Sequence, residues 1–126
     1  MKRIWIGIVL LLVLLMAGIG ISAFMEESHL PIARDVRHAG ALAMESQWGP
    51  AQAYANRGLK QWEKKWPVTA AIADHEPMDE IDALFAQLKV YAAAKDAPAY
   101  TAACACLASQ LEALSQSHSF NWWNLM

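Results

Sequence analysis

The chain has 126 residues, of which 56% are hydrophobic and 17% are charged, and its formal net charge is −2. This length gives room for one domain, and the apolar content excludes a chain that stays disordered in water. Once Lys2 and Arg3 are set aside, residues 25–126 hold 8 of the 10 basic residues and all 12 acids, a formal charge of −4. That region lacks a basic stripe of the density that nucleic-acid binding requires, so DNA or RNA is not expected as a partner.

The segment 4–24 contains 21 residues without a charged side chain. As an α-helix it would be about 31 Å long, which matches the hydrocarbon thickness of a bilayer. Because Lys2 and Arg3 precede it, the positive-inside rule predicts a cytoplasmic N-terminus at residues 1–3, a single-pass transmembrane anchor at 4–24 and an extracytoplasmic domain at 25–126. The predicted location is therefore the cell membrane.

A cleaved signal peptide is the alternative interpretation of the same segment. Ser22 and Ala23 place small residues at a possible cleavage point, but Ile21 suits its position there poorly. The apolar stretch is also longer than the roughly 7–15 residues of a signal-peptide core. We therefore expect the anchor to be retained.

Beyond the anchor, apolar residues recur with helical spacing, and no run of alternating residues indicates a strand. We expect an all-α domain of two helical hairpins, with helices over about 31–46, 50–66, 77–95 and 96–117 and with Asp96 as the N-cap of the last. The turns QWGPA and KDAPA resemble those of tetratricopeptide-type helix pairs. Two hairpins are too few for a solenoid, so the sequence predicts a compact four-helix bundle.

Prolines set the predicted helix boundaries. Pro31, Pro50 and Pro77 suit the first turn of a helix, where the missing N–H would have no partner. Pro67 lacks the N–H that a helix interior needs, so we expect it to end or kink the second helix. Residues 68–74 are then a connector.

Each predicted helix has one apolar stripe, which we expect to form the core. The inward residues are Ile32, Val36, Ala39, Ala43, Ala51, Ala55, Leu59, Trp62, Trp66, Ile81, Leu84, Phe85, Leu88, Tyr91 or Ala92, Tyr100, Cys104, Leu107, Leu111 and Leu114. Cys104 belongs to its stripe and Cys106 does not. Two helical positions that differ by two residues point about 200° apart, so these thiols cannot bond to each other. We expect both cysteines to act as small apolar residues that fill space. The alternatives are an intermolecular disulfide and half of a metal site. Neither alternative is supported by a second pair of cysteines or by a His at ligand spacing.

The acidic stretch DHEPMDEID, residues 74–82, is the candidate for a metal or acid–base site. Asp74, His75 and Asp79 are the candidate metal ligands, because His75 and Asp79 have the spacing that puts two side chains on one helix face. A helix that begins at Pro77 would instead separate them and place the acids at the positive end of its dipole. We expect this charged helix start, with no catalytic residue and no cofactor. The remaining histidines are scattered and are expected at the surface or at boundaries: His29, His38 and His118.

The tryptophans are the more informative residues. Trp62 and Trp66 lie on an apolar stripe, so we expect them in the core, with indole N–H groups that need acceptors. An exposed surface for a peptide, a glycan or a partner helix is the alternative. Its candidate residues are Trp48, Arg57, Lys60, Lys64, Trp122 and Trp123. The apolar tail 117–126 is expected to pack on its own domain, or onto something else.

The order of these features resembles one known family. The features that carry the resemblance are the spanning helix, the turn from Trp48 to Ala51, the helix that ends in tryptophans and the last helix, which begins with Asp. In this order they are similar to the features of small membrane-anchored proteins of Gram-positive, mainly endospore-forming, bacteria, which are grouped as the domain of unknown function DUF4363. The resemblance covers nearly the whole chain and is most specific at 74–76, 81–82 and 124–126, although the Cys-Ala-Cys segment and the late Trp pair are unusual for it. It implies the architecture and the topology, and it implies no activity.

The sequence therefore predicts a non-enzymatic, membrane-anchored, extracytoplasmic helical domain that binds an unknown protein partner or assembles with itself. One alternative is a metal-dependent sensor or enzyme that uses Asp74, His75 and Asp79. Another is the binding of cell-wall glycan or peptide by exposed tryptophans.

Overall fold

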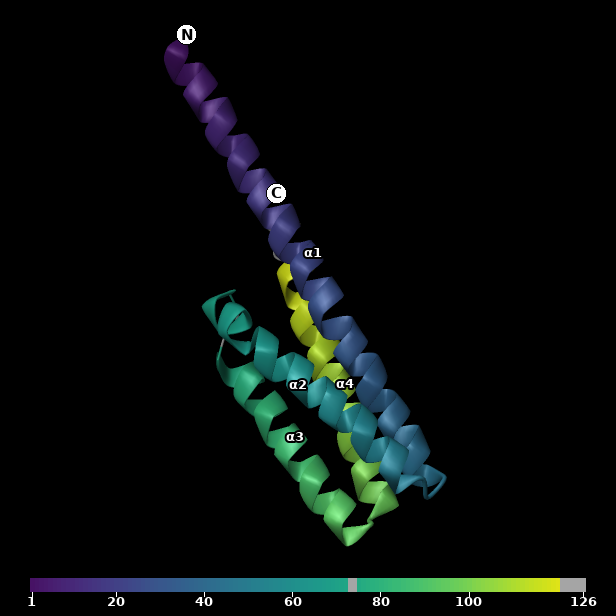
Figure 1. Cartoon of the computed structure of the whole chain (residues 1–126). Helices are drawn as coiled ribbons and strands as arrows, with labels where there is room; N and C mark the ends of the chain where they lie inside the picture. The colour runs from purple at the N-terminus through teal and green to yellow at the C-terminus, as the bar shows by residue number, and fades with distance from the viewer. Residues whose placement is uncertain (73–74, 121–126) are drawn as a thin grey trace.

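The computed structural model describes residues 1–72 and 75–120, with the backbone alone at 21–28, 72 and 117–120. The described residues form four α-helices and no strand, which confirms the predicted all-α class. The helices are α1 at Lys2–Met44, α2 at Trp48–Ile72, α3 at His75–Ala94 and α4 at Ala97–Phe120. They run up and down in a bundle, from which the first half of α1 projects alone (Figure 1).

The helix α1 is continuous through the predicted boundary between the anchor and the bundle. It has 43 residues and contains Pro31 in its interior, whereas the sequence predicted a new helix at this proline. An interior proline costs about 3 kcal/mol or more, because it removes one backbone hydrogen bond and crowds a carbonyl. The turns that follow offset this cost, since Ile32 and Val36 are both fully buried. The apolar segment and the first bundle helix are therefore one element.

The helix α2 also continues past a proline. The sequence predicted an end or a kink at Pro67 and a connector at 68–74, but α2 extends to Ile72. Thr69 shows what holds this last turn, because it is fully buried and its hydroxyl donates to the Lys65 carbonyl at 2.9 Å. The burial of Thr69 and its hydrogen bond offset the local preference of proline to end the helix.

One described segment, Lys2–Gly20, is long and apolar enough to cross a membrane. Its mean hydropathy is 2.4 and none of it is buried within the protein. Large apolar side chains along it, such as Leu11 and Met16, are exposed, and proteins in water rarely expose a continuous apolar surface of this kind. Length and composition are compatible with a single-pass anchor and also with a signal sequence.

The two tight turns of the bundle share one geometry. Ser46 and Lys95 have positive φ, the left-handed conformation that often ends a helix. After each of them, the N–H of Gln47 or Asp96 donates to the carbonyl five residues back, at 2.9 and 3.0 Å respectively. Asp96 then accepts the N–H of Ala99 at 3.2 Å, which confirms it as the N-cap of α4.

Small residues determine which helices approach closely. A Cβ added at Gly40 of α1 would lie only 3.1 Å from the Cβ of Cys104 in α4, and one added at Gly58 of α2 would lie 3.5 Å from the side chains of Ile32 and Val36. Accordingly α1 packs most extensively on α4 and then on α2, while α3 packs on α4. The helices α2 and α3 touch least, so the side of the bundle between them is the loosest.

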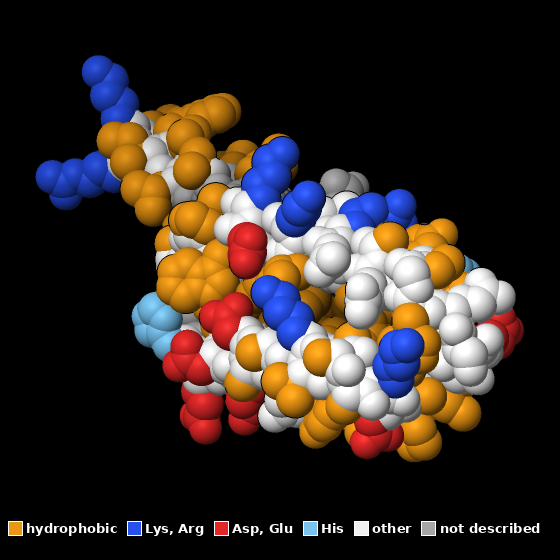
Figure 2. Space-filling view, turned by 60° about the horizontal axis from the view of Figure 1, so that its bottom comes forward, with side chains coloured by type: hydrophobic (Ala, Val, Ile, Leu, Met, Phe, Trp, Pro, Cys, Tyr) orange, Lys and Arg blue, Asp and Glu red, His pale blue; other side chains and the backbone are white. Residues whose placement is uncertain are grey.

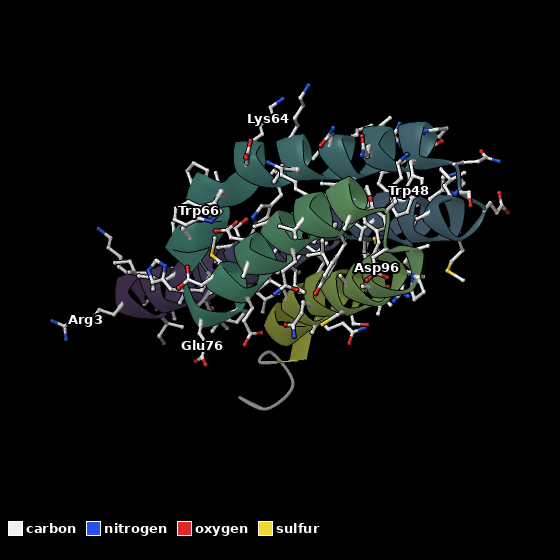
Figure 3. All side chains as sticks on the ribbon, turned by 90° about the horizontal axis from the view of Figure 1, so that it is seen from below. Arg3, Trp48, Lys64, Trp66, Glu76 and Asp96 are labelled. Atoms are coloured by element: carbon white, nitrogen blue, oxygen red, sulfur yellow. The ribbon has the colours of Figure 1, made fainter. Side chains whose placement is uncertain are left out.

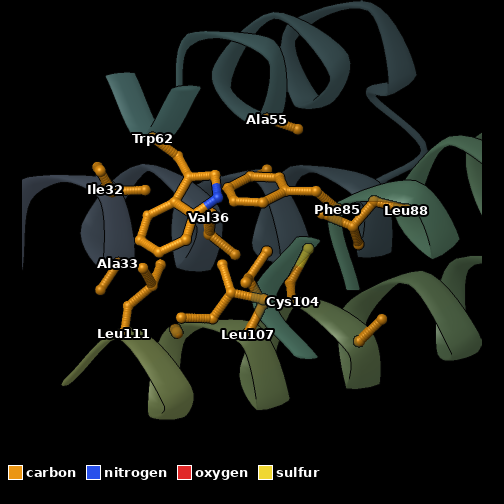
Figure 4. Close-up of a cluster of buried hydrophobic side chains, with 14 of the residues drawn as sticks. Ile32, Ala33, Val36, Ala55, Trp62, Phe85, Leu88, Cys104, Leu107 and Leu111 are labelled. Atoms are coloured by element: carbon orange, nitrogen blue, oxygen red, sulfur yellow. The ribbon is translucent and has the colours of Figure 1, made fainter. Parts of the chain in front are cut away.

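The core confirms most of the predicted apolar stripe. Figure 4 shows Trp62 among Ile32, Val36 and Phe85, and the Trp62 side chain is fully buried. Other predicted core residues are only half-buried at its edge: Leu59, Trp66, Leu84 and Tyr91. Ala92, the alternative to Tyr91, is the buried one of that pair.

Candidate functional site

A single carboxylate of α3 joins the two tryptophans of α2. The indole N–H of Trp62 donates to Oδ1 of Asp82 at 2.6 Å, and that of Trp66 donates to Oδ2 at 3.2 Å. Because the tryptophans are four residues apart, they lie one above the other on the same face of α2, where one carboxylate reaches both. We call Trp62, Trp66 and Asp82 the indole clamp. It supplies the acceptors that the sequence predicted the indoles would need.

A buried polar contact lies beside the clamp, where α1 meets α2. His29 is fully buried, which corrects the expected position at the surface or at a boundary, and its ring packs edge-on against Trp62 with centroids 5.8 Å apart. Its Nε2 lies 3.5 Å from the hydroxyl oxygen of Thr69. Since that hydroxyl donates its own hydrogen to the Lys65 carbonyl, its oxygen can accept one from Nε2. The contact ties α1, just after the apolar segment, to the last turn of α2.

An open groove runs along the surface between α2 and α3. Two sections, with volumes of about 260 and 560 Å³, share Leu59, Phe85 and Lys89 as lining residues, and the larger section ends at Trp66 and Asp82 of the clamp. Figure 2 shows hydrophobic side chains on the floor of a hollow on this face, with charged side chains at its rim. We call this feature the α2–α3 groove. It exists because α2 and α3 touch least among the packed helices.

The two ends of the bundle carry different residues. Trp66 and Glu76 lie at the end from which the apolar segment projects, whereas Trp48 and Asp96 lie at the far end (Figures 1 and 3). Trp48, a candidate for the interaction surface, is half-buried, and its ring packs edge-on against Tyr100 with centroids 5.3 Å apart. It therefore contributes to packing at the far end and offers only part of its ring to a partner.

Arg57, a second candidate for the interaction surface, is paired within the bundle. Its Nε donates to Oδ2 of Asp35 at 2.9 Å, and a second N–H of the guanidinium donates to Oδ1. The Asp35 side chain is 12% exposed and the Arg57 side chain 58%. The hydrogen bond and the negative charge of Asp35 raise the pKa of Arg57. The charge of Arg57 thus compensates a buried acid between α1 and α2.

The remaining candidates for the interaction surface are two lysines and two tryptophans. Lys60 and Lys64 are exposed on α2. Trp122 and Trp123 lie outside the described residues.

Two of the three candidate metal ligands lie in the described part of the chain. His75 and Asp79 are both exposed near the start of α3, and Asp74 lies outside the described residues. Within residues 1–72 and 75–120, no group of three His, Cys, Asp or Glu side chains is placed to hold a metal ion. Glu76 lies in the first turn of α3, as the prediction of a charged helix start requires. α3 itself begins at His75, two residues before the predicted Pro77.

Cys104 lies on the inward face of α4 as predicted, whereas Cys106 lies off that face and does not have the expected role of apolar filler. Cys104 is buried and Cys106 is exposed. Burial raises the pKa of the Cys104 thiol to about 12, so this side chain stays protonated and unreactive near neutral pH.

The described residues include four buried polar side chains that the sequence pattern did not indicate: His29, Asp35, Thr69 and Ser115. A signal for His29 was present, because it continues the apolar stripe of α1 one turn toward the N-terminus, and the assumed helix start at Pro31 hid it. Asp35 lies directly before the buried Val36. An acid at the edge of an apolar stripe indicates a paired carboxylate. Thr69 lies in the turn that was predicted to be a connector.

The fold and the groove define a class of protein: a small helical bundle whose first helix extends into a long apolar segment. Residues 20–125 match the family described as Domain of unknown function (DUF4363), and the chain belongs to that family. The family predicted from the sequence is therefore confirmed. The match covers the whole bundle and only the end of the apolar segment. No curated protein and no solved structure matches the chain.

Proposed function

We propose that the chain is a single-pass membrane protein whose extracytoplasmic bundle binds an amphipathic helix of a protein partner in the α2–α3 groove. In this proposal residues 1–3 lie in the cytoplasm, residues 4–24 cross the membrane, and residues 25–126 lie outside the cytoplasm. The protein acts by binding and has no catalytic role.

The α2–α3 groove is the observation that carries the proposal. Phe85 and Leu88 line it and are each only 3% exposed, so they are fixed in the core and form a stable apolar floor. Helices bind such grooves with apolar side chains spaced three or four residues apart. Lys89 lines both sections of the groove. The partner helix therefore needs apolar residues for the floor and an acid to face Lys89.

The apolar segment supports the membrane part of the proposal. Every residue of Lys2–Gly20 is exposed apart from one half-buried position. Lys2 and Arg3 at its start favour a cytoplasmic N-terminus. Because α1 continues from this segment into the bundle, the groove is carried at a defined height and orientation above the membrane.

Site-specific photo-crosslinking in native membranes tests the groove in the full chain. A photoreactive side chain is placed at Ala86, an exposed residue that lines the groove. Ala105, exposed on α4 and absent from the groove lining, is the matched control position. We expect a discrete adduct from position 86, none from position 105, and a weaker adduct at 86 after Lys89→Glu.

The mass of the adduct identifies the partner. An adduct of twice the mass of the chain means that the occupant is a second copy, and any other discrete mass means that it is a different protein. No adduct from position 86, or equal adducts from both positions, would contradict the proposal.

A further inference from the structure

We infer that a pocket between α1 and α2 binds the headgroup of an anionic phospholipid of the phosphoglycerol class, which carries a phosphate and hydroxyl groups. We call this site the α1–α2 pocket, and its volume is about 530 Å³. Its lining residues are Pro31, Gln61, Lys64, Lys65 and Val68. The inference rests on the proposed membrane anchor, but it concerns a different site from the α2–α3 groove.

The α1–α2 pocket lies at the height of the expected membrane surface. Figure 1 shows the last turns of α2 at the end of the bundle from which the apolar segment projects. The ring of His29 on α1 packs against that of Trp62 on α2. Antiparallel helices advance equally in opposite directions, so Val68, six residues beyond Trp62, comes opposite residue 23 of α1. The uncharged run that forms the anchor ends at Phe24. Val68, which is 49% exposed, is therefore level with the edge of the hydrocarbon.

The two lysines of the pocket lie one turn higher, in the headgroup layer. Counted from the ion pair of Asp35 with Arg57, Lys64 and Lys65 come opposite residues 28 and 27 of α1. They are thus about 5–6 Å beyond the edge of the hydrocarbon, and the headgroup layer of one leaflet is roughly 5–7 Å thick. Lys64 is exposed and forms no ion pair with another described residue. Its charge is therefore available to a lipid phosphate.

Gln61 adds an acceptor at the end of the pocket that is farther from the membrane. Its Oε1 is buried and has no hydrogen-bond partner among the described residues. Buried polar atoms are nearly always paired, so this oxygen indicates a missing donor. A hydroxyl that enters the pocket can donate to it once the half-buried amide rotates.

The order of these groups along the pocket matches the order of groups in phosphatidylglycerol. From the membrane outward the pocket presents apolar Val68, then the two lysines, then the acceptor of Gln61. The lipid presents acyl chains, then a phosphate, then hydroxyl groups. Phosphatidylcholine has no N–H or O–H in its headgroup to donate to Gln61. Phosphatidylethanolamine has such a donor, but its ammonium would be repelled by Lys64 and Lys65, and the described lining residues include no Asp or Glu.

The lipids that the full chain retains test the inference. The chain is incorporated into bilayer nanodiscs that contain phosphatidylglycerol and phosphatidylcholine in equal amounts. Native mass spectrometry then identifies the lipid that stays bound when the chain is released. A basic residue beside an anionic lipid strengthens binding about fivefold. With two lysines in the pocket, we expect phosphatidylglycerol to be retained over phosphatidylcholine by at least about tenfold.

Three variants locate the retained lipid on the chain. Lys64→Gln together with Lys65→Gln should abolish the preference for phosphatidylglycerol. The matched control is Lys89→Gln together with Lys95→Gln, which removes the same charge outside the pocket and should leave the preference unchanged. Gln61→Leu keeps both lysines and removes the acceptor, so it should weaken the retention of phosphatidylglycerol about two- to tenfold.

Failure of this inference can be distinguished from failure of the anchor. If the chain enters the nanodiscs but retains both lipids equally, the anchor stands and the inference is overturned. A preference that persists without Lys64 and Lys65 also overturns it, because the lipid is then held elsewhere, as at Lys2 and Arg3. If soluble glycerol phosphate displaces the retained lipid at equal concentration, the pocket serves a soluble ligand and the assignment to lipid is wrong. If the chain does not enter the nanodiscs, the proposed anchor fails and the inference fails with it.

Discussion

Replacement of Asp82 by alanine removes the acceptor from both indoles of the clamp and should destabilise the bundle by about 2–4 kcal/mol. A hydrogen bond to a charged group contributes roughly 1.5–3 kcal/mol. We assign this contribution of roughly 1.5–3 kcal/mol to the 2.6 Å bond from Trp62. The Trp62 side chain is entirely buried, so its N–H would lose its partner in the variant. The bond of 3.2 Å from Trp66 is exposed, so water can replace Asp82 there at a cost of about 1 kcal/mol or less.

Urea unfolding of the full chain in detergent micelles, followed by far-UV circular dichroism, measures this loss. For a slope of about 2 kcal/mol per molar urea, the midpoint should fall by about 1–2 M. Asp82→Asn keeps one carbonyl oxygen as an acceptor and should lose about 1 kcal/mol. The matched control is Asp79→Ala, an exposed acid one turn earlier on α3, where the loss should stay below about 1 kcal/mol.

Two results would refute the reasoning. The first is equal midpoints for Asp82→Ala and Asp79→Ala, which would mean that water satisfies both indoles as well as the carboxylate does. The second is strict additivity between Asp82→Ala and Trp62→Phe, because groups that share a hydrogen bond should show a coupling energy of about 0.5 kcal/mol or more.

Further predictions concern the contact between α1 and α4 and the two thiols. Gly40→Ala should lower the free energy of unfolding by about 1–3 kcal/mol in the same urea assay, because the new Cβ would lie 3.1 Å from that of Cys104. Gly49→Ala is the control, since nothing lies within 4 Å of its new Cβ, and it should be neutral or slightly stabilising. A membrane-impermeant maleimide should label one thiol of the chain in intact cells. Cys106→Ala should abolish this label, whereas Cys104→Ala should not. An unlabelled chain would contradict the proposed extracytoplasmic topology. The pKa of the Cys104 thiol is about 12 in the folded protein and about 8.5 in an unfolded chain. Because the unfolded chain loses this proton at a lower pH, the free energy of unfolding should fall as the pH rises above about 8.5. Cys104→Ala should make that fall shallower, and an identical pH profile would show that the thiol contributes nothing.

The helices could be predicted from the sequence because each carries an unbroken apolar stripe, but their ends could not. Pro31 and Pro67 both fit a local rule that places them at helix boundaries. In the structure, both lie inside helices, and the turn that follows each proline contains a fully buried residue, Ile32 or Thr69. A sequence pattern gives the local cost of proline, whereas the compensating burial depends on helices that are distant in the sequence.

The candidate site was only partly predictable for a similar reason. The sequence identified Trp62 as a core residue that needs an acceptor, and it placed Asp82 in a charged stretch. Which acid reaches which indole depends on how α2 and α3 are aligned after the chain reverses, and no local pattern contains that alignment. Burial of His29 was likewise hidden, because it depends on the continuation of α1 through Pro31.

The indole clamp and the groove are physically connected through the weak contact between α2 and α3. The backbones of these two helices approach each other less closely than those of the other packed pairs. Asp82 of α3 accepts two hydrogen bonds from indole N–H groups of α2, and it lines the larger section of the groove together with Trp66. The carboxylate therefore links the two helices at the end nearest the apolar segment. The buried contact of His29 joins this same end of α2 to α1, so three helices are linked by polar side chains beside the larger section of the groove.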